Sequence, residues 1–398
     1  MKTALILFKE LDGVFPAEYV KDVAELLKNG GTEIDVLEVL QSDDLHNFNK
    51  RLEEFKETAD NLIIVGGENN AYSVKEVISS VMATELIENE NALKFVEAIS
   101  KSNGKEYSTE YAKLPIDATL IPNLKGPFQG YMLENEVFSL VVLPEEFDQL
   151  KTMCEGYVIP YFDNKYGIKR ERFTFKYFGD EKLLQKVLLE AEENYDGTFR
   201  KAVKTKNGDT LVNIIFEGGS TDQAKRHVIS NLGANIYAEF DTTLGERLFD
   251  LLKLRGVKIS VAESFTGGRV VSSIISNSGA SAYVNEGVVS YSNDSKKRRL
   301  NVKEEDLRLH GAVSSKVAYQ MVTGLLNGGG CDVAISTTGI AGPKSDDTAK
   351  PVGLCFIAVG MKDGVHVYKY VLKGDREEIT ETAKNTALFL AIKKLKNI

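Results

Sequence analysis

The chain has 398 residues, more than a single ordinary hydrophobic core accommodates, so two or three domains are expected. Its composition, with 43% hydrophobic and 27% charged residues, is typical of globular proteins, and its net charge of −9 restricts any nucleic-acid surface to a local patch. The three cysteines and four histidines form no CxxC, HxxxH or HExxH motif. This argues against a disulfide framework and a zinc site, and a reducing, cytoplasmic location is expected. No apolar run reaches the roughly 18 residues that a membrane span needs.

Strand and helix patterns alternate along the first 168 residues. Apolar runs and helical periods predict elements in the order βαβαβ at 4–8, 17–28, 33–39, 45–56 and 61–65. A later strand is predicted at 137–143. Because a βαβαβ order implies parallel strands covered by helices, we predict an N-terminal three-layer α/β domain with a mostly parallel sheet at residues 1–168.

The pattern changes in residues 169–243, which predict a small α+β module. Strands and helices are expected at 173–178, 181–194, 211–216, 220–232 and 235–238. Ser220 is the expected N-cap of the second helix. The module shows no GxxG clamp and no aromatic pair of the kind that nucleic-acid-binding modules use, so nucleic acid is not an expected partner.

Residues 244–398 return to an alternating pattern and predict a C-terminal α/β domain. Elements are expected at 248–254, 257–261, 269–276, 287–291, 333–336, 352–359, 366–371 and 383–395. Ser314 or Ser315 is expected to cap a further helix that ends at Leu326. The turn Lys362-Asp363-Gly364 predicts that the strands on its two sides pair as a hairpin.

Two strand ends in this domain carry glycine-rich loops, Ser264–Gly268 and Thr338–Gly342. Glycine lets backbone N–H groups approach a ligand closely, and a helix N-terminus favours an anion. One interpretation is a serine presented to a substrate that carries a phosphate. The other is a pair of ordinary turns between strand and helix.

Lys296 follows the polar segment Tyr291-Ser292-Asn293 and is a candidate base for that serine, since no histidine lies nearby in the sequence. A free lysine has a pKa of roughly 10.4 and is a poor base near neutrality, but burial can lower this pKa by several units. The alternative is that Lys296 belongs to a solvated basic run, Lys296–Arg299.

Six segments of the C-terminal domain carry a family resemblance. They are Ala262–Gly268, Tyr291–Asn293 with Lys296, His310–Ser314, Gly339–Pro343, Lys350–Gly353 and Gly374–Arg376. In this order the set resembles the C-terminal domain of the CinA family, the competence/damage-inducible proteins. Together with the two upstream domains, the whole chain resembles full-length CinA.

The resemblance implies a nicotinamide-nucleotide amidohydrolase. Such an enzyme converts the carboxamide of nicotinamide mononucleotide (NMN) to the acid and releases ammonia, without a metal or a cofactor. Carried over by motif, Ser264 is the implied nucleophile, Lys296 the base, and Tyr291 and Thr338 polar partners of the amide. The implied contacts to the substrate, its oxyanion or its phosphate are Glu263, Thr266, Gly267, Gly268, Asn293, Gly339, Gly342 and Arg376.

Two positions depart from the family pattern. Phe265 stands where the family usually has a cysteine, beside the nucleophile. Thr380 stands where the family usually has an arginine, which is a candidate contact to the phosphate. Arg376 and Lys350 are the candidate replacements for that arginine.

The first domain resembles the molybdopterin-binding-type domain of CinA proteins, which can act as an ADP-ribose pyrophosphatase. The family's motifs fall on Phe8–Leu11, Gly66–Ala71 and Leu143–Phe147, where the expected aspartates and most of the glycines are missing. Diphosphate hydrolysis needs a metal to neutralise charge and N–H groups to hold oxygens. We therefore predict a degenerate, structural domain.

The middle module occupies the place of the family's KH-like domain, and a homodimer organised by that module is expected. Two functions other than NMN hydrolysis remain open from the sequence. One is a catalytically weakened interaction protein linked to competence and recombination. The other is residual ADP-ribose pyrophosphatase activity in the first domain.

Overall fold

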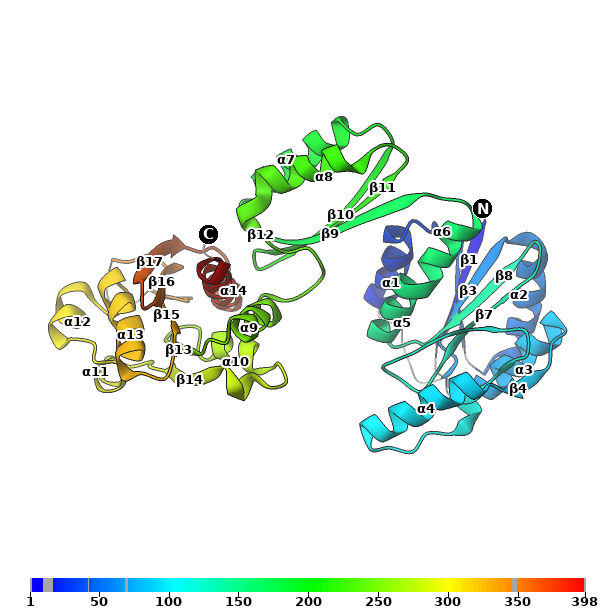
Figure 1. Ribbon diagram of the computed structural model, residues 1–398, viewed down its shortest axis with the longest axis horizontal. Coiled ribbons are helices and arrows are strands. Elements are labelled where there is room, and N and C mark those ends of the chain that lie inside the picture. Colours follow the sequence, from blue (N-terminus) through cyan, green and yellow to red (C-terminus); the bar gives the residue numbers. More distant parts are fainter. Residues whose placement is uncertain (1, 10–16, 42, 69–70, 346–348, 397–398) are drawn as a thin grey trace. The chain divides into compact units, whose positions relative to one another are not determined.

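The computed structural model describes residues 2–9, 17–41, 43–68, 71–345 and 349–396 (Figure 1). The chain divides into two compact units, Met1–Glu171 and Arg172–Ile398. The boundary predicted after residue 168 lies close to this division, whereas the one predicted after residue 243 falls inside the second unit, between two sheets. The division into three domains therefore stays a prediction.

The first unit is built on a six-stranded sheet in the order β2-β1-β3-β8-β7-β6. Its strands are β1 (Thr3–Lys9), β2 (Val36–Gln41), β3 (Asn61–Val65), β6 (Thr119–Ile121), β7 (Gly130–Glu134) and β8 (Ser139–Leu143). β2, β1, β3 and β8 run parallel, whereas β7 and β6 extend one edge in antiparallel fashion. The mostly parallel sheet expected from the βαβαβ order is confirmed.

Helices cover both faces of this sheet. They are α1 (Ala17–Asn29), α2 (Leu45–Thr58), α3 (Ala71–Met82), α4 (Glu90–Asn103), α5 (Phe147–Met153) and α6 (Ile159–Lys165). Successive residues of β1 point into different cores, because Ile6 packs in the cluster of Phe48 from α2 and Leu7 in that of Val23 from α1. Figure 1 shows α1, α5 and α6 on one side of the sheet and α2 and α3 on the other. A separate antiparallel pair joins β4 (Leu86–Glu88) and β5 (Lys113–Pro115).

A four-stranded sheet in the order β10-β11-β9-β12 forms the first part of the second unit. Its elements are β9 (Arg170–Phe178), α7 (Glu181–Glu193), β10 (Thr198–Lys206), β11 (Asp209–Glu217), α8 (Thr221–Leu232) and β12 (Ile236–Ala238). The sequence pattern does not predict β10, and the reason is that none of its residues is buried. Ser220 occupies the N-cap position of α8 as expected, but its hydroxyl makes no capping hydrogen bond.

The rest of the second unit is built on a five-stranded sheet in the order β14-β13-β15-β16-β17. Its strands are β13 (Ile259–Glu263), β14 (Val284–Val289), β15 (Val333–Gly339), β16 (Leu354–Met361) and β17 (Gly364–Val371). β14, β13 and β15 are parallel, and β16 and β17 form the expected antiparallel hairpin around Lys362-Asp363.

Helices flank this sheet. They are α9 (Leu244–Arg255), α10 (Arg269–Ile275), α11 (Asn293–Leu300), α12 (Glu304–His310), α13 (Ser315–Gly328) and α14 (Arg376–Lys396). Val261 of β13 faces the core shared with α9, α10 and α14, and Ala262 faces the core shared with α11 and α13. Ser314 caps α13, as one of the two predicted serines. β14 begins and ends earlier than the predicted 287–291, and α11, which carries Lys296, is not predicted.

Candidate active site

The candidate site lies where two neighbouring parallel strands end side by side. Glu263, the last residue of β13, pairs with Val289, the last residue of β14. From β13 the chain passes into Ser264, and from β14 it passes through Ser290 into α11. The carboxyl edge of a parallel sheet is where open α/β sheets bind ligands. The strand ends that lead to Ser264 and to Lys296 therefore lie side by side at this edge.

Lys296, the fourth residue of α11, reaches Ser264 with its side chain. Its Nζ lies 3.0 Å from Ser264 Oγ, and it also donates to the carbonyl oxygens of Ser290 at 2.7 Å and Tyr291 at 3.2 Å. The side chain is 1% exposed, and this burial lowers the pKa of Lys296 to about 8. Lys297, by contrast, pairs with exposed Glu304. The predicted contact is confirmed, and Lys296 is not part of a solvated basic run.

Glu263 is buried and its carboxylate is fully occupied by groups of the chain. Oε2 accepts from the Thr266 hydroxyl at 2.7 Å, from the Gly268 amide at 3.0 Å and from the Val270 amide at 3.1 Å, and Oε1 accepts from the Val271 amide at 2.9 Å. The sequence predicts Glu263 as a substrate contact. The structure instead makes it the acceptor that caps the start of α10.

The backbone of the Ser264–Gly268 loop is a tight turn. Gly267 and Gly268 have φ values of +61° and +98°, which only glycine adopts without strain. The Ser264 amide donates to Thr337 O at 3.0 Å, and the Gly267 amide to Ser264 O at 3.3 Å. Within the described residues, the amides of Phe265 and Thr266 are the loop amides left without an acceptor. Gly267 and Gly268, predicted as oxyanion or phosphate contacts, already use their amides internally.

The side chain of Phe265 packs into a core. It is buried in a cluster with Ala341, Cys355, Ile379 and Ala383. A Cβ at Gly339 would approach the Phe265 ring to 2.9 Å, so the ring packs directly on the second glycine-rich loop. The residue that departs from the family pattern thus joins the nucleophile's loop to α14.

The second glycine-rich loop is held from two sides. The Thr338 hydroxyl donates to Ala312 O at 2.9 Å. The side chain predicted to contact the carboxamide of the substrate therefore already has an acceptor within the chain. Arg376 donates through Nη1 to Gly342 O at 2.6 Å. Lys350, the other candidate replacement for the family's arginine, donates to His310 O at 2.7 Å and Val313 O at 2.8 Å.

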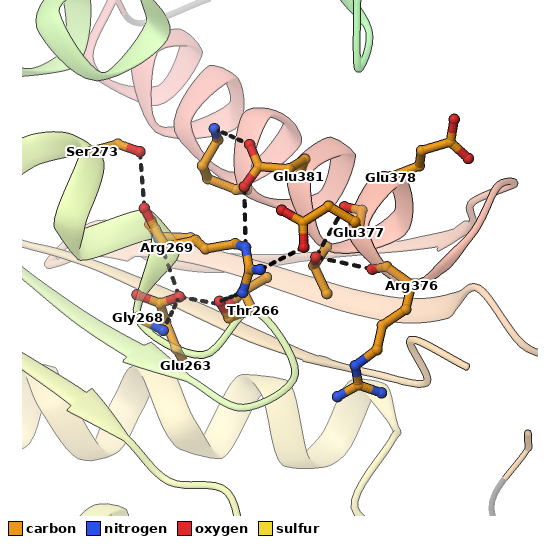
Figure 2. Close-up of polar contacts among 12 residues, drawn as sticks. Glu263, Thr266, Gly268, Arg269, Ser273, Arg376, Glu377, Glu378 and Glu381 are labelled. Carbon is orange, nitrogen blue, oxygen red and sulfur yellow. Dashed lines mark hydrogen bonds and ion pairs between the residues drawn. The ribbon is translucent and has the colours of Figure 1, made fainter. Parts of the chain in front are cut away.

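An ionic chain ties the start of α10 to the start of α14 (Figure 2). Arg269 Nη2 lies 2.7 Å from Glu377 and its Nε lies 3.1 Å from Glu381, which in turn pairs with Lys384 at 2.5 Å. Thr380, on the same helix, is 2% exposed, and its hydroxyl donates to carbonyl oxygens of its own helix. Thr380 therefore offers no polar group in place of the family's arginine.

Two other predicted site residues lie at the surface. Tyr291 is 67% exposed, and its carbonyl oxygen rather than its hydroxyl contacts Lys296. Asn293, the first residue of α11, is also exposed. The structure thus brings Ser264 and Lys296 together at one buried point and leaves Tyr291 and Asn293 at the surface.

Two hollows lie beside α14. The smaller, of about 330 Å³, is lined by Gly267, Gly268, Arg269, Ser272, Ser273, Glu381 and Lys384. The larger, of about 480 Å³, adjoins it and extends to residues 206–209, the tip of the β10–β11 hairpin. Ser264 and Lys296 line neither hollow.

In the first unit, Glu68 directly follows the Gly66-Gly67 turn. Glu68 Oε1 accepts a hydrogen bond of 2.6 Å from the Glu145 amide. Glu10, Leu11, Asn69 and Asn70, on which part of the family comparison falls, lie outside the described residues. No group of three or more possible metal ligands occurs in the part of the chain that the structure describes. In that part, too, no helix is long and apolar enough to cross a membrane.

Sequence comparison decides the family. The CinA C-terminal domain family matches residues 241–395. A putative competence-damage inducible protein from Caldicellulosiruptor saccharolyticus is 32% identical over 362 residues, which cover 87% of each chain. The chain belongs to the CinA family. A CinA-like protein from Kosmotoga olearia is likewise 32% identical, over 79% of each chain.

Solved CinA structures are similar to part of the chain. A CinA superfamily protein from Klebsiella pneumoniae is 30% identical, covers 39% of this chain and 97% of its own, and gives a TM-score of 0.38. A competence/damage-inducible protein from Agrobacterium tumefaciens is 34% identical, with 39% and 99% covered and a TM-score of 0.37.

Proposed function

We propose that this CinA-family protein hydrolyses the carboxamide of NMN to nicotinate mononucleotide and ammonia. The observation that carries the proposal is the 3.0 Å contact between Ser264 Oγ and the buried Nζ of Lys296. The choice of substrate comes from the resemblance to the CinA family. Independence from metal and cofactor and assembly as a homodimer belong to the same proposal and rest on that resemblance.

The reaction is a serine–lysine acyl transfer. Neutral Lys296 takes the proton of Ser264 as Oγ attacks the carboxamide carbon, and the resulting ammonium returns a proton to the nitrogen, which leaves as ammonia. Water then attacks the acyl-serine with Lys296 again as base, and the acid and free Ser264 are released. A lysine with a pKa of about 8 supplies enough of the neutral amine for this role near neutrality.

Backbone amides are the proposed donors to the oxyanion. The amides of Phe265 and Thr266, which make no hydrogen bond within the described residues, directly follow the nucleophile in the chain, and fixed donors at a developing negative charge supply a large part of the rate in acyl transfer. Glu263 occupies the amides at the start of α10, so we assign the phosphate to the second glycine-rich loop and to Arg376, which binds that loop.

The test compares ammonia release from NMN by three proteins. We expect release by the wild type, no release above background by Ser264→Ala, and a wild-type rate for Ser276→Ala. Ser276 is a matched control, because it is an exposed serine whose hydroxyl bonds only its own helix. All three proteins should melt at similar temperatures. Release by Ser264→Ala at the wild-type rate would exclude the serine mechanism, and no release by the wild type would exclude the amidohydrolase.

A further inference from the structure

Glu263 is the buried acid nearest in sequence to the nucleophile. It is 1% exposed and directly precedes Ser264. Three of its four hydrogen-bond partners are backbone N–H groups, which can only donate, and they engage both of its oxygens. Both oxygens of the side chain therefore accept hydrogen bonds from the loop and from the start of α10.

These bonds close the nucleophile's loop on itself. Glu263 directly precedes the loop, whereas the amides that it binds belong to Gly268, the last residue of the loop (Figure 2), and to Val270 and Val271 in α10. Ser264 lies between the two anchor points. A rigid connection across the loop limits the positions that the Ser264 hydroxyl can take relative to Lys296.

The Thr266 hydroxyl extends this connection to the next strand. It donates to Glu263 at 2.7 Å and lies 2.7 Å from the hydroxyl of Thr337 in β15. Thr266 and Thr337 are both fully buried. The loop is thus fixed to the sheet through side chains as well as through the Ser264 amide.

Local capping alone does not require this arrangement. The N-cap position of α10 is Gly268, which has no side chain, so the cap comes from five residues earlier in the chain. In α9 of the same unit, Glu246 and Thr243 form an ordinary capping box next to the helix they cap. Because Ser264 lies between Glu263 and the helix that Glu263 caps, this cap couples the position of Ser264 to α10. A cap from a residue next to the helix does not do so.

We propose that Glu263 is a positioning residue, which holds the Ser264 loop in the geometry that Lys296 needs for proton transfer. The proposal rests on the amidohydrolase function proposed above. Glu263 touches neither the substrate nor the reacting atoms, and it acts through the loop backbone.

The test is Glu263→Gln, which keeps the shape of the side chain and replaces one acceptor by an NH₂ group facing a backbone donor. Misplacing a reacting group by about 1 Å costs roughly 100-fold in rate, so we expect kcat to fall by about that factor. We expect KM to stay within about threefold and the pH midpoint set by Lys296 to stay unchanged. The control is Glu246→Gln, which weakens the α9 cap and should lower the melting temperature while leaving kcat unchanged.

Two kinetic outcomes would overturn the proposal. A raised KM with an unchanged kcat would make Glu263 a substrate contact. An unchanged kcat and KM, with a loss of stability like that of Glu246→Gln, would make it a cap and nothing more. If Glu263→Gln does not fold, Thr266→Val removes one donor to the same carboxylate, and we expect it to lower kcat by roughly tenfold with little change in KM.

Amide hydrogen exchange separates this proposal from the proposed function. In Glu263→Gln the amides of Gly268, Val270 and Val271 should exchange faster than in the wild type, and those of α13 should not change. If the wild type releases no ammonia, the amidohydrolase is excluded and exchange alone decides whether Glu263 holds the loop. Equal exchange in both proteins would overturn the positioning role whatever the activity.

Discussion

Lys296 and Lys297 are neighbours in the sequence but differ in environment. Lys296 is buried against Ser264 and two carbonyl oxygens, whereas Lys297 pairs with an exposed glutamate. Burial without a neutralising acid disfavours the charged form, which is why the pKa of Lys296 falls to about 8. The loss of hydration on burial makes the charged form of this lysine unfavourable, and for the same reason the neutral amine is available to act as a base.

Substitution of the two lysines should therefore give opposite results. We expect Lys296→Ala to lower kcat for NMN by 100-fold or more, within the range of roughly 10²–10⁴ that a positioned base supplies. Lys296→Arg should be nearly as slow, because a guanidinium stays protonated. Lys297→Ala should remain within about twofold of the wild type. Steady-state ammonia release measures all three, and a fast Lys296→Arg enzyme would exclude lysine as the base.

The pH dependence follows from the lowered pKa of Lys296. The active form carries the neutral amine, so kcat/KM should rise between pH 7 and 9, with a midpoint near the pKa of about 8, and then level off. Below the midpoint the slope should approach tenfold per pH unit. A profile of ammonia release over this range is the measurement. A flat or falling profile would contradict Lys296 as the base.

At the scale of elements, the candidate site depends on how one loop joins a strand to two helices. The ring of Phe265 packs against residues of α14 and so fixes the loop to this helix. Arg269 connects the start of α10 to the same helix through ion pairs with Glu377 and Glu381. Thr380 lies buried between these two acids in the sequence. Of the two departures from the family pattern, Phe265 therefore lies in the contact between the loop and α14, and Thr380 is buried within α14 itself.

Restoring the family's cysteine should damage this contact. Phe265→Cys leaves a cavity in a cluster with Ile379 and Ala383, and large-to-small changes of this kind cost about 2–4 kcal/mol. We expect a lower free energy of unfolding in urea and no gain in kcat, because the ring packs in a hydrophobic cluster that does not include Ser264. A variant that is both stable and faster would show that the ring obstructs the site.

The sequence predicts the elements whose burial pattern is strong and misses those that lack one. The continuously buried β13 and β15 and the loop glycines could be placed, because apolar runs and glycine pairs leave a clear signal in the sequence. β10 has no buried residue and α11 is highly charged, so neither has an apolar face to detect. The role of Glu263 could not be predicted, because it depends on amides that lie five to eight residues further along.

At the scale of the whole molecule, the first unit is an α/β unit in which an acidic side chain follows the Gly66-Gly67 turn. The Glu145 amide, a possible donor to a phosphate, is occupied by Glu68, which also places negative charge beside the Gly66-Gly67 turn. We therefore expect no appreciable release of AMP from ADP-ribose with magnesium, manganese or cobalt. Turnover that is lost on substitution of Glu68 would show that this unit is an enzyme.

The candidate site, in contrast, is built within the second unit alone. The bonds of Ser264, Lys296 and Glu263 all lie between residues 263 and 337, and this unit has hydrophobic cores of its own. A variant that begins at residue 169 keeps β9 whole, so its four-stranded sheet should form. We expect this variant to release ammonia from NMN with the kcat and KM of the full chain, while Ser264→Ala abolishes release in both. A folded but inactive variant, shown by circular dichroism and a cooperative melt, would mean that the first unit contributes to the site.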